Sequence, residues 1–261
     1  MLQIKHPLGN AFRILASITS HPYEGILQCL CQWHGREQVI QVECKIKLIG
    51  RYSYFFLIEF KDFSNDLPDP VKLGSRVAEM HKSSVSPTGM FGFHISTYDG
   101  AKPQDIAWDS NWASLFTKLL KNAYQQDVRS NGVWKELDDA FQRTLTHLIP
   151  RLLGVLQTEG RTLKPCLIHG DMWEGNIGTE VDTGDPWIFD SAVYYAHAEM
   201  ELGIWTAERH QLNAKVYKKE YLRNMEPSEP AEEWEDRNRL YRTKTNFAYS
   251  ADYPGSDPRY Q

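Results

Sequence analysis

The sequence predicts an α+β protein in which a small β-sheet region precedes a larger, mainly helical part. Residues 39–48 and 54–60 are rich in β-branched and aromatic side chains and flank a turn that contains Gly50, a pattern typical of two paired strands. Apolar residues then recur every three or four positions over residues 110–128 and 137–157, which predicts two amphipathic helices. With 261 residues, of which 41% are hydrophobic, the chain is long enough to bury a substantial core.

Shorter signals predict the remaining elements. Asp69 and Pro70 precede a helical pattern over residues 71–83, and proline is favoured in the first turn of a helix. The apolar face of that helix is expected to comprise Val71, Leu73, Val77 and Met80. Residues 199–224 are also expected to be helical, whereas residues 226–236 are expected to form an acidic, proline-containing surface segment.

Charge and composition exclude several classes of partner. The formal net charge is −5, so neither nucleic acid nor an anionic membrane is expected to bind, since both attract clustered Lys and Arg. No apolar run approaches the roughly 18 residues that span a bilayer, and the N-terminal sequence lacks the apolar core of a secretory signal. Four unevenly spaced cysteines are too few for a disulfide framework. We therefore expect a monomeric cytoplasmic protein with reduced thiols.

Polar side chains are concentrated after a short apolar strand that leads into the sequence HGDMWEGN. Asp171 follows this strand, Asn176 comes five residues later, and Asp190 ends the second half of a predicted hairpin made by residues 176–181 and 186–190. Antiparallel pairing would return Asp190 to the side of Asn176. Phosphoryl transfer from a nucleotide needs a group that orients the acceptor hydroxyl, together with oxygen ligands for magnesium. We therefore interpret Asp171 as the catalytic base, and Asn176 and Asp190 as Mg²⁺ ligands.

A purely structural interpretation of these residues stands beside the catalytic one. Asp and Asn near glycine most often cap turns, so Asp171 or Asn176 taken alone would favour that role. The complete pattern of apolar strand, His169-Gly170-Asp171, Asn176, hairpin and Asp190 favours chemistry. His169 is expected to support the loop through hydrogen bonds to the backbone.

Two segments carry a resemblance to a known family. LIHGDMWEGN (residues 167–176) and WIFDSAVYYAHAEMELG (residues 187–203) resemble the fructosamine kinase, or ketosamine-3-kinase, family, and in particular its fungal members. The pattern HGD-x-W-x-GN is narrower than the HGD-x-x-x-x-N of the related aminoglycoside phosphotransferases. The resemblance implies a protein-kinase-like fold, ATP and Mg²⁺ as cofactors, and phosphorylation of a sugar hydroxyl on a ketosamine, either free or attached to a protein lysine. In this family such phosphorylation destabilises the adduct and so reverses glycation.

The resemblance also assigns roles to individual residues. It implies the roles given above for the aspartates and the asparagine. FFLIEF resembles the hinge strand of kinases, and the backbone expected to face adenine belongs to Glu59, Phe60 and Lys61. Trp173 is expected to support the catalytic loop. Aromatic faces and a carboxylate suit a sugar that bears an amine, although packing beneath the loop accounts equally well for the tyrosines. Together with Trp173, the residues expected at the acceptor pocket are Tyr194, Tyr195, His197 and Glu199.

The first 54 residues depart from the family pattern. A kinase-like N-lobe supplies a glycine-rich turn, a strand lysine and a glutamate that pairs with that lysine, and none is recognisable in this sequence. Lys45 and Lys47 lie too close to the hinge-like strand to leave room for the intervening helix. We therefore predict a truncated or atypical N-lobe over residues 1–60, which ends in the hinge-like strand, and a helical C-lobe over residues 61–261.

Three alternatives to an active ketosamine kinase stand at this point. A catalytically impaired relative could bind a nucleotide or a glycated ligand, because loss of a phosphate-binding lysine removes electrostatic stabilisation of the reaction. An active enzyme could instead phosphorylate a different hydroxyl compound, such as an aminoglycoside or a choline-like amine. Finally, the chain could be an incomplete gene product whose fragmentary N-lobe exposes apolar surface.

Overall fold

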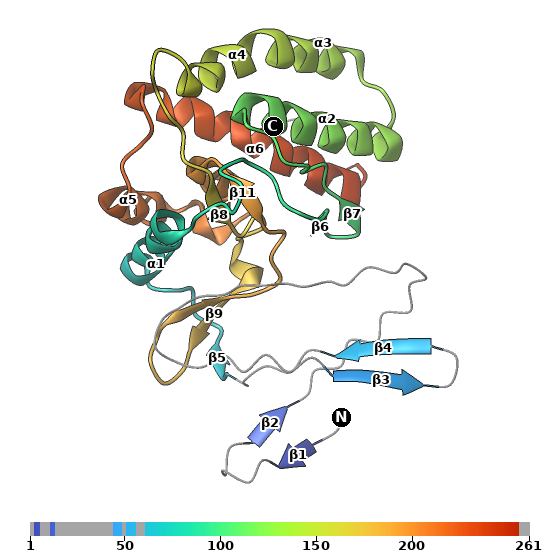
Figure 1. Ribbon diagram of the computed structural model, residues 1–261, viewed down its shortest axis with the longest axis vertical. Helices are drawn as coiled ribbons and strands as arrows, with labels where there is room; N and C mark the ends of the chain where they lie inside the picture. The colour runs from blue at the N-terminus through green and yellow to red at the C-terminus, as the bar shows by residue number, and fades with distance from the viewer. Residues whose placement is uncertain (1–2, 6–10, 14–43, 49–50, 56–60, 256–261) are drawn as a thin grey trace. The chain divides into compact units, whose positions relative to one another are not determined.

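Two compact units make up the computed structural model of this chain (Figure 1). The structure describes residues 3–5, 11–13, 44–48, 51–55 and 61–255, with side chains from residue 61 onward. The first unit comprises Met1–Ser64 and Glu180–Asp182, and the second comprises Asn65–Thr179 and Thr183–Gln261.

Short strands form most of the described part of the first unit. They are β1 (Gln3–Lys5), β2 (Ala11–Arg13), β3 (Cys44–Leu48), β4 (Arg51–Phe55) and β5 (Phe63–Ser64). β1 pairs with β2, and β3 pairs with β4 so that Lys47 lies opposite Tyr52. The second pairing confirms a hairpin here, although β4 begins at Arg51 and not at the predicted residue 54. Positions 39–43 and 56–60 of the predicted strands lie outside the described residues.

Helices dominate the second unit. Its α-helices are α1 (Pro70–Ser83), α2 (Trp112–Asn131), α3 (Lys135–Arg143), α4 (Ile149–Leu152), α5 (Lys215–Asn224) and α6 (Trp234–Asp252). Its strands are β6 (Tyr98–Asp99), β7 (Lys102–Pro103), β8 (Cys166–Ile168), β10 (Pro186–Ile188) and β11 (Tyr194–Ala196), together with β9 (Ile177–Glu180), whose last residue belongs to the first unit. No helix in the described part of the chain is long and apolar enough to cross a bilayer.

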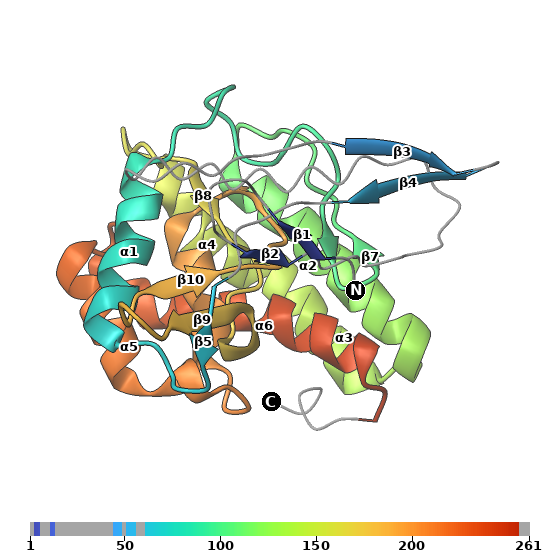
Figure 2. The same ribbon diagram turned by 90° about the horizontal axis from the view of Figure 1, so that it is seen from below.

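Helix α1 begins where the sequence predicts. The Asp69 side chain accepts a hydrogen bond from the backbone N–H of Lys72 at 2.9 Å, which caps the first turn. Leu73 and Val77 are buried as expected, but Val71 is 56% exposed. That part of the prediction is wrong because residues two positions apart point to nearly opposite sides of a helix. The buried face packs on α5, as Figures 1 and 2 both show.

Helices α2 and α6 pack side by side and enclose the larger core (Figures 1 and 2). The Asn111 side chain caps α2 by accepting the backbone N–H of Ser114 at 2.8 Å, so the predicted helix is confirmed. Between the helices, the buried indole N–H of Trp112 donates to the Tyr241 hydroxyl at 2.8 Å. This bond satisfies the polar atom of a large aromatic side chain that is otherwise surrounded by apolar groups.

The helix predicted over residues 137–157 is interrupted. A π-helical turn, Thr144–Leu148, follows α3, and a 3₁₀ turn, Gly154–Gln157, follows α4. Pro150 explains the change, because proline has no backbone N–H and its ring clashes with the carbonyl four residues before it. A π turn directly before the proline accommodates both effects.

The region predicted as one helix over residues 199–224 is also divided. Ala198–Thr206 and Gln211–Asn213 are 3₁₀ helices, and only Lys215–Asn224 is α-helical. All side chains from Ala198 to Trp205 are buried, including the carboxylates of Glu199 and Glu201. These two carboxylates bind different partners in the interior, and those contacts, rather than an amphipathic pattern, determine the local backbone.

Candidate active site

A loop between two strands carries the candidate catalytic residues. β8 pairs antiparallel with β11, with Ile168 opposite Tyr194, and the chain then enters the turn at His169. The end of β8 lies in the core beneath α2, whereas Met172 lies in a second core with Trp205, whose indole N–H donates to the Met172 carbonyl at 2.8 Å. The loop is therefore anchored at both ends by buried side chains.

Gly170 is required by the shape of this turn. Its φ angle is +82°, and a side chain here would place its Cβ atom 2.5 Å from the carbonyl oxygen of Ala192. Both the backbone conformation and the lack of space exclude larger residues. The glycine therefore lets the segment after β10 pack directly against the backbone that precedes Asp171.

His169 connects the two strands that lead to the site. Its Nε2 atom lies 2.8 Å from the carbonyl oxygen of Phe189, and its Nδ1 atom accepts the backbone N–H of Asp171 at 3.2 Å. A neutral imidazole with the proton on Nε2 satisfies both contacts. These bonds are those that a supporting role for His169 requires.

The side-chain amide of Asn176 holds Asp171 in place. Its Nδ2 atom donates to Asp171 Oδ2 at 2.9 Å and to the Asp171 carbonyl oxygen at 2.8 Å, and the carbonyl oxygen of Asp190 lies 3.4 Å away. Asn176 is only 5% exposed. The β9–β10 hairpin pairs Ile177 with Ile188, which confirms the predicted hairpin and brings residues 171, 176 and 190 together.

The Asp171 carboxyl group has an unusual electrostatic environment. Burial raises its pKa to about 7, and the negative charges of Asp99 and, more weakly, Asp190 act in the same direction. The positive charge of Lys244 and the hydrogen bond from Asn176 oppose this shift. A carboxyl group whose pKa lies near neutrality is suited to accept a proton from a hydroxyl group at physiological pH.

The oxygen atoms around Asn176 fit a magnesium ion. Because Nδ2 of Asn176 is occupied by Asp171, its Oδ1 atom is left to coordinate, and the Asp190 carboxylate makes no hydrogen bond within the described residues. Mg²⁺ prefers one or two carboxylates supplemented by neutral oxygens and water. Asp190 also has a φ angle of +58°, which is uncommon for a residue with a side chain and is found at sites where geometry is set by function.

Trp173 explains the glycine five positions after Gly170. A Cβ atom at Gly175 would lie 2.2 Å from the Trp173 ring, so the indole packs directly on the backbone of the loop. The ring is 37% exposed, and its centroid lies 5.7 Å from that of His210. The spacing W-x-G in the motif is thus a packing requirement, and it leaves one side of the ring open to solvent.

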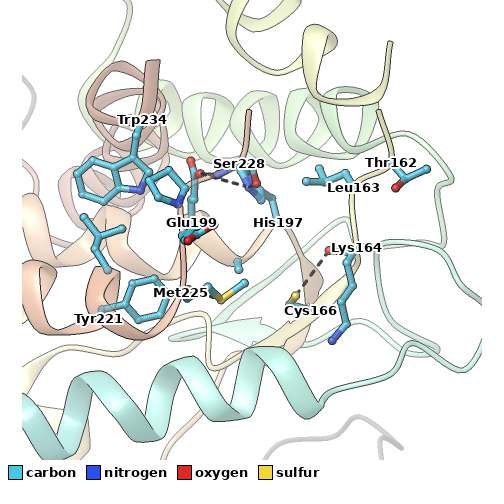
Figure 3. A pocket seen from close by; sticks show the side chains of 14 residues that line it. Thr162, Leu163, Lys164, Cys166, His197, Glu199, Tyr221, Met225, Ser228 and Trp234 are labelled. Carbon is cyan, nitrogen blue, oxygen red and sulfur yellow. Dashed lines mark hydrogen bonds and ion pairs between the residues drawn. The ribbon is translucent and has the colours of Figure 1, made fainter. Parts of the chain in front are cut away.

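Apart from Trp173, the residues expected at an acceptor pocket are dispersed. Tyr194 is fully buried, and the Tyr195 ring lies at a tilt of 33° to that of Trp108, with a centroid distance of 6.0 Å. His197 and Glu199 line a cavity of about 200 Å³ (Figure 3). Residues 171, 176 and 190 are not among the described residues that line it. The part of the two tyrosines, His197 and Glu199 in acceptor binding stays a prediction that the geometry does not favour.

Structural partners occupy the polar atoms of His197 and Glu199. The imidazole bonds to Tyr241 at 2.7 Å and to Ser228 at 2.9 Å, and burial lowers its pKa to about 4, so it is neutral. Glu199 accepts two hydrogen bonds from the buried guanidinium of Arg237, at 2.7 and 2.9 Å. Figure 3 shows His197, Glu199 and Ser228 side by side at the cavity wall.

Glu201 is a residue that sequence reasoning missed. Its carboxylate accepts the backbone N–H groups of His169 at 2.5 Å and Gly170 at 3.0 Å, and it lies 3.6 Å from the buried His81 ring. It therefore fixes the backbone directly before Asp171. The available signal was the presence of two acidic residues in the apolar run AHAEMELGIW, since buried carboxylates require partners.

The predicted adenine-facing residues are described only in part. Glu59 and Phe60 lie outside the described residues. Lys61 forms an ion pair with Glu180 at 3.0 Å within the first unit, and its side chain is 15% exposed. The hinge role of residues 59–61 stays a prediction.

A family model described as fructosamine kinase matches residues 36–253. This chain belongs to the fructosamine kinase family. It is 34% identical over 154 residues to a chloroplastic protein-ribulosamine 3-kinase of Oryza sativa subsp. indica, a match that covers 59% of this chain and 43% of the relative. The chain thus matches less than half of the length of that curated relative.

Solved structures show that this family member has the protein-kinase-like fold. A protein classed as a fructosamine-3-kinase in Thermobifida fusca YX-ER1 superposes with a TM-score of 0.62 at 19% identity, over 80% of this chain and 67% of that chain. An aminoglycoside phosphotransferase, a thermostable mutant in its apo form, superposes with a TM-score of 0.52 at 13% identity, over 85% and 73% of the two chains. The expected fold class and family are confirmed.

Proposed function

We propose that this chain transfers the γ-phosphoryl group of ATP to a sugar hydroxyl of a ketosamine, either free or attached to a protein lysine. The observation that carries the proposal is the fixed position of Asp171, whose carboxylate accepts the Asn176 amide at 2.9 Å in a loop anchored by two buried cores. Membership of the fructosamine kinase family supports the choice of acceptor. Phosphorylation of such adducts would serve the removal of glycation.

Asp171 would act on the acceptor hydroxyl. Its carboxylate orients the hydroxyl for in-line attack and takes the proton as the new P–O bond forms and the bond between the β,γ-bridging oxygen and the γ-phosphorus breaks. ADP leaves with the bridging oxygen, so charge and atoms balance. Because the Asp171 pKa is raised to about 7, this carboxylate is a stronger base than an exposed aspartate.

Asn176 and Asp190 would hold magnesium against the phosphates. When bound, the ion would neutralise negative charge on the transferred group. The residues of this chain would contribute the Asn176 Oδ1 atom, which is oriented because Nδ2 bonds to Asp171, and the Asp190 carboxylate, which has no side-chain hydrogen bond to any described residue. The hairpin pairing of Ile177 with Ile188 would keep these two ligands in register.

The first unit would serve as the atypical N-lobe, with Glu59, Phe60 and Lys61 facing adenine. The family match supports this proposal, because it begins at residue 36, upstream of the β3–β4 hairpin. A monomeric state and a cytoplasmic location are proposed from composition alone, which shows few cysteines and a net charge of −5.

ATP consumption tests the proposal. The purified chain is incubated with ATP, Mg²⁺ and a fructose–lysine adduct, with the Asp171→Ala variant as a matched control. We expect adduct-dependent turnover that the substitution abolishes. Absence of turnover from a folded, monodisperse wild-type protein would contradict the proposed activity.

A binding protein without turnover is the second candidate. Its support is the combination of an intact Asn176 and Asp190 pair with an N-terminal sequence in which no phosphate-binding lysine is recognisable. Calorimetric titration with ATP and Mg²⁺ separates the two candidates. Nucleotide binding without phosphorylation of any ketosamine would favour the binding protein.

A further inference from the structure

A buried ion pair lies close to the catalytic loop. Asp99 lies in the short hairpin formed by β6 and β7. Its Oδ2 atom accepts a hydrogen bond from Nζ of Lys244, in the middle of α6, at 2.7 Å. The Lys244 side chain is 6% exposed and that of Asp99 is 23% exposed. The pair is thus buried on its lysine side and open on its aspartate side.

Two contacts place this hairpin against the loop that carries Asp171. The Gln104 side chain donates to the carbonyl oxygen of Ala192 at 3.1 Å, and Thr97 donates to the same oxygen at 3.5 Å. That oxygen is the atom that packs on Gly170. Burial raises the pKa of Asp171 most, the negative charge of Asp99 raises it further, and the positive charge of Lys244 opposes the shift.

The pair is not needed to hold the hairpin on α6. Lys102, directly opposite Asp99 in the hairpin, forms a second ion pair with Asp252 near the end of the same helix. That pair is more exposed, with side chains at 20% and 39%. Burying two charges carries a desolvation cost that a purely structural contact does not repay well. The burial of a second ion pair between the same hairpin and helix, close to the catalytic loop, therefore needs another explanation.

Polar groups near the pair are left without partners. Asp99 uses only Oδ2 to bind Lys244, and its Oδ1 atom has no hydrogen bond with any residue that the structure describes. The buried Tyr194 hydroxyl also has no partner among the described residues, and burial raises its pKa to about 12, while the charge of Lys244 acts in the opposite direction. A buried hydroxyl without a partner is unfavourable, so a water or a ligand hydroxyl is expected here.

We propose that Asp99, held in place by Lys244, forms a polar wall of the acceptor site and binds a sugar hydroxyl of the ketosamine next to Asp171. Asp99 Oδ1 accepts a hydrogen bond from the hydroxyl group, while the buried Lys244 orients the carboxylate from the other side. This inference rests on the proposed function, because it takes the acceptor to be a ketosamine. It makes the pair a determinant of acceptor affinity rather than of nucleotide affinity.

Two double variants test the inference. Asp99→Leu with Lys244→Met removes both charges of the buried pair and leaves no single buried ion, a change that folded proteins often tolerate. Lys102→Met with Asp252→Leu is the matched control, because it removes the other tie between the same hairpin and the same helix. Calorimetry on the full chain measures the Kd of fructose–lysine without ATP, and thermal melting checks that each variant is folded.

We expect the first double variant to raise the Kd for fructose–lysine about tenfold or more, the loss expected for hydrogen bonds to charged groups. The Lys102→Met, Asp252→Leu control should leave the Kd unchanged. Equal affinities for the wild type and the first variant would overturn the inference, as would equal weakening in both variants or no binding by the wild type. If the first variant does not fold, Asp99→Asn keeps the shape of the side chain and carries the same prediction.

The turnover assay distinguishes this inference from the proposed function. If the wild type binds fructose–lysine through Asp99 and Lys244 but transfers no phosphoryl group, the acceptor site stands and the proposed activity fails. If turnover occurs and the KM for fructose–lysine is the same in the first double variant and the wild type, the activity stands and the acceptor site fails. A rise in the KM for fructose–lysine with an unchanged KM for ATP supports both.

Discussion

The catalytic site and the buried charge network formed by Glu199, Glu201 and their partners use carboxylates in opposite ways. Asp190, which follows β10 at the catalytic site, is exposed, adopts a φ angle of +58° and makes no side-chain hydrogen bond within the described residues. In the buried network, Glu199 and Glu201 are almost completely inaccessible to solvent, and each accepts more than one hydrogen bond. The Asp190 carboxylate is thus available to ligands, whereas those of the network maintain the fold.

This difference predicts that substitutions in the two regions have separable effects. Changes to the catalytic site should lower the rate of phosphoryl transfer with little effect on the free energy of unfolding. Changes to the network should lower the free energy of unfolding first, because they leave buried charges without partners. Glu201 lies between the two regions, since it binds the loop backbone from the buried side.

The largest effect on stability is expected for Glu199→Leu. This change leaves the Arg237 guanidinium, which is completely buried, without its carboxylate partner. We expect the free energy of unfolding to fall by about 3–5 kcal/mol, measured by chemical denaturation. Arg151→Ala is the control, because its ion pair with Glu233 is exposed at 57% on the arginine side and should contribute about 1 kcal/mol or less. Similar losses in the two variants would contradict the distinction.

A dependence of stability on pH should follow from His197. Burial lowers its pKa from 6.5 to about 4 in the folded protein, so the unfolded chain binds a proton in this interval and the folded chain does not. The contribution of neutral His197 to the free energy of unfolding is fully present above pH 6.5 and decreases as the pH falls toward 4. The total decrease amounts to about 3 kcal/mol. Denaturation curves recorded through this interval should show a smaller decrease for His197→Asn than for the wild type. An identical decrease in both proteins would exclude His197 as a source.

Glu201→Gln should affect both properties to a moderate extent. The amide retains one oxygen acceptor but presents an NH₂ group to a backbone N–H of His169 or Gly170, so one buried donor loses its partner. We expect a loss of about 1–3 kcal/mol in the free energy of unfolding, and a lower kcat because the loop before Asp171 is less well fixed. Steady-state kinetics and denaturation of the same preparation measure the two effects. Unchanged kcat would show that the loop is held without Glu201.

Asp190→Gly should have the smallest effect on the free energy of unfolding, and unlike Glu199→Leu and Glu201→Gln it should not lower it. Glycine adopts a φ angle of +58° without strain, so the free energy of unfolding is expected to be unchanged or to rise by about 1 kcal/mol. Loss of the proposed magnesium ligand should nevertheless reduce turnover and raise the Mg²⁺ concentration needed for half-maximal rate. A variant that is destabilised yet fully active would contradict the assignment of Asp190 to the catalytic side of the comparison.

Local patterns were sufficient to predict the loop, because its geometry is determined by short-range features. The turn after β8, the Asp190 position and the β9–β10 hairpin all follow from residues within one continuous segment. The helices α1 and α2 were also predicted correctly, because each has a capping side chain and a repeating apolar face.

Contacts between distant segments could not be predicted in the same way. Asp99 and Lys244 are separated by 145 positions, and Glu199 and Arg237 by 38, so no local pattern links either pair. The division of residues 199–224 into shorter helices has the same origin, because buried partners on α6 and before Asp171 determine the backbone there. Pro150 was a local signal, and its effect on the helix over residues 137–157 was missed.

The comparison is tested most directly by Asp171→Asn, with turnover and stability measured on the same preparation. The substitution retains the size of the side chain and removes the proposed base, which typically contributes about 10²–10⁴-fold to the rate. We predict that ketosamine phosphorylation falls by a factor in this range, while the free energy of unfolding is maintained or increased, because the buried carboxyl is replaced by a neutral amide. A variant that retains wild-type turnover, or one that loses activity only because it unfolds, would contradict the assignment of Asp171 as the catalytic base.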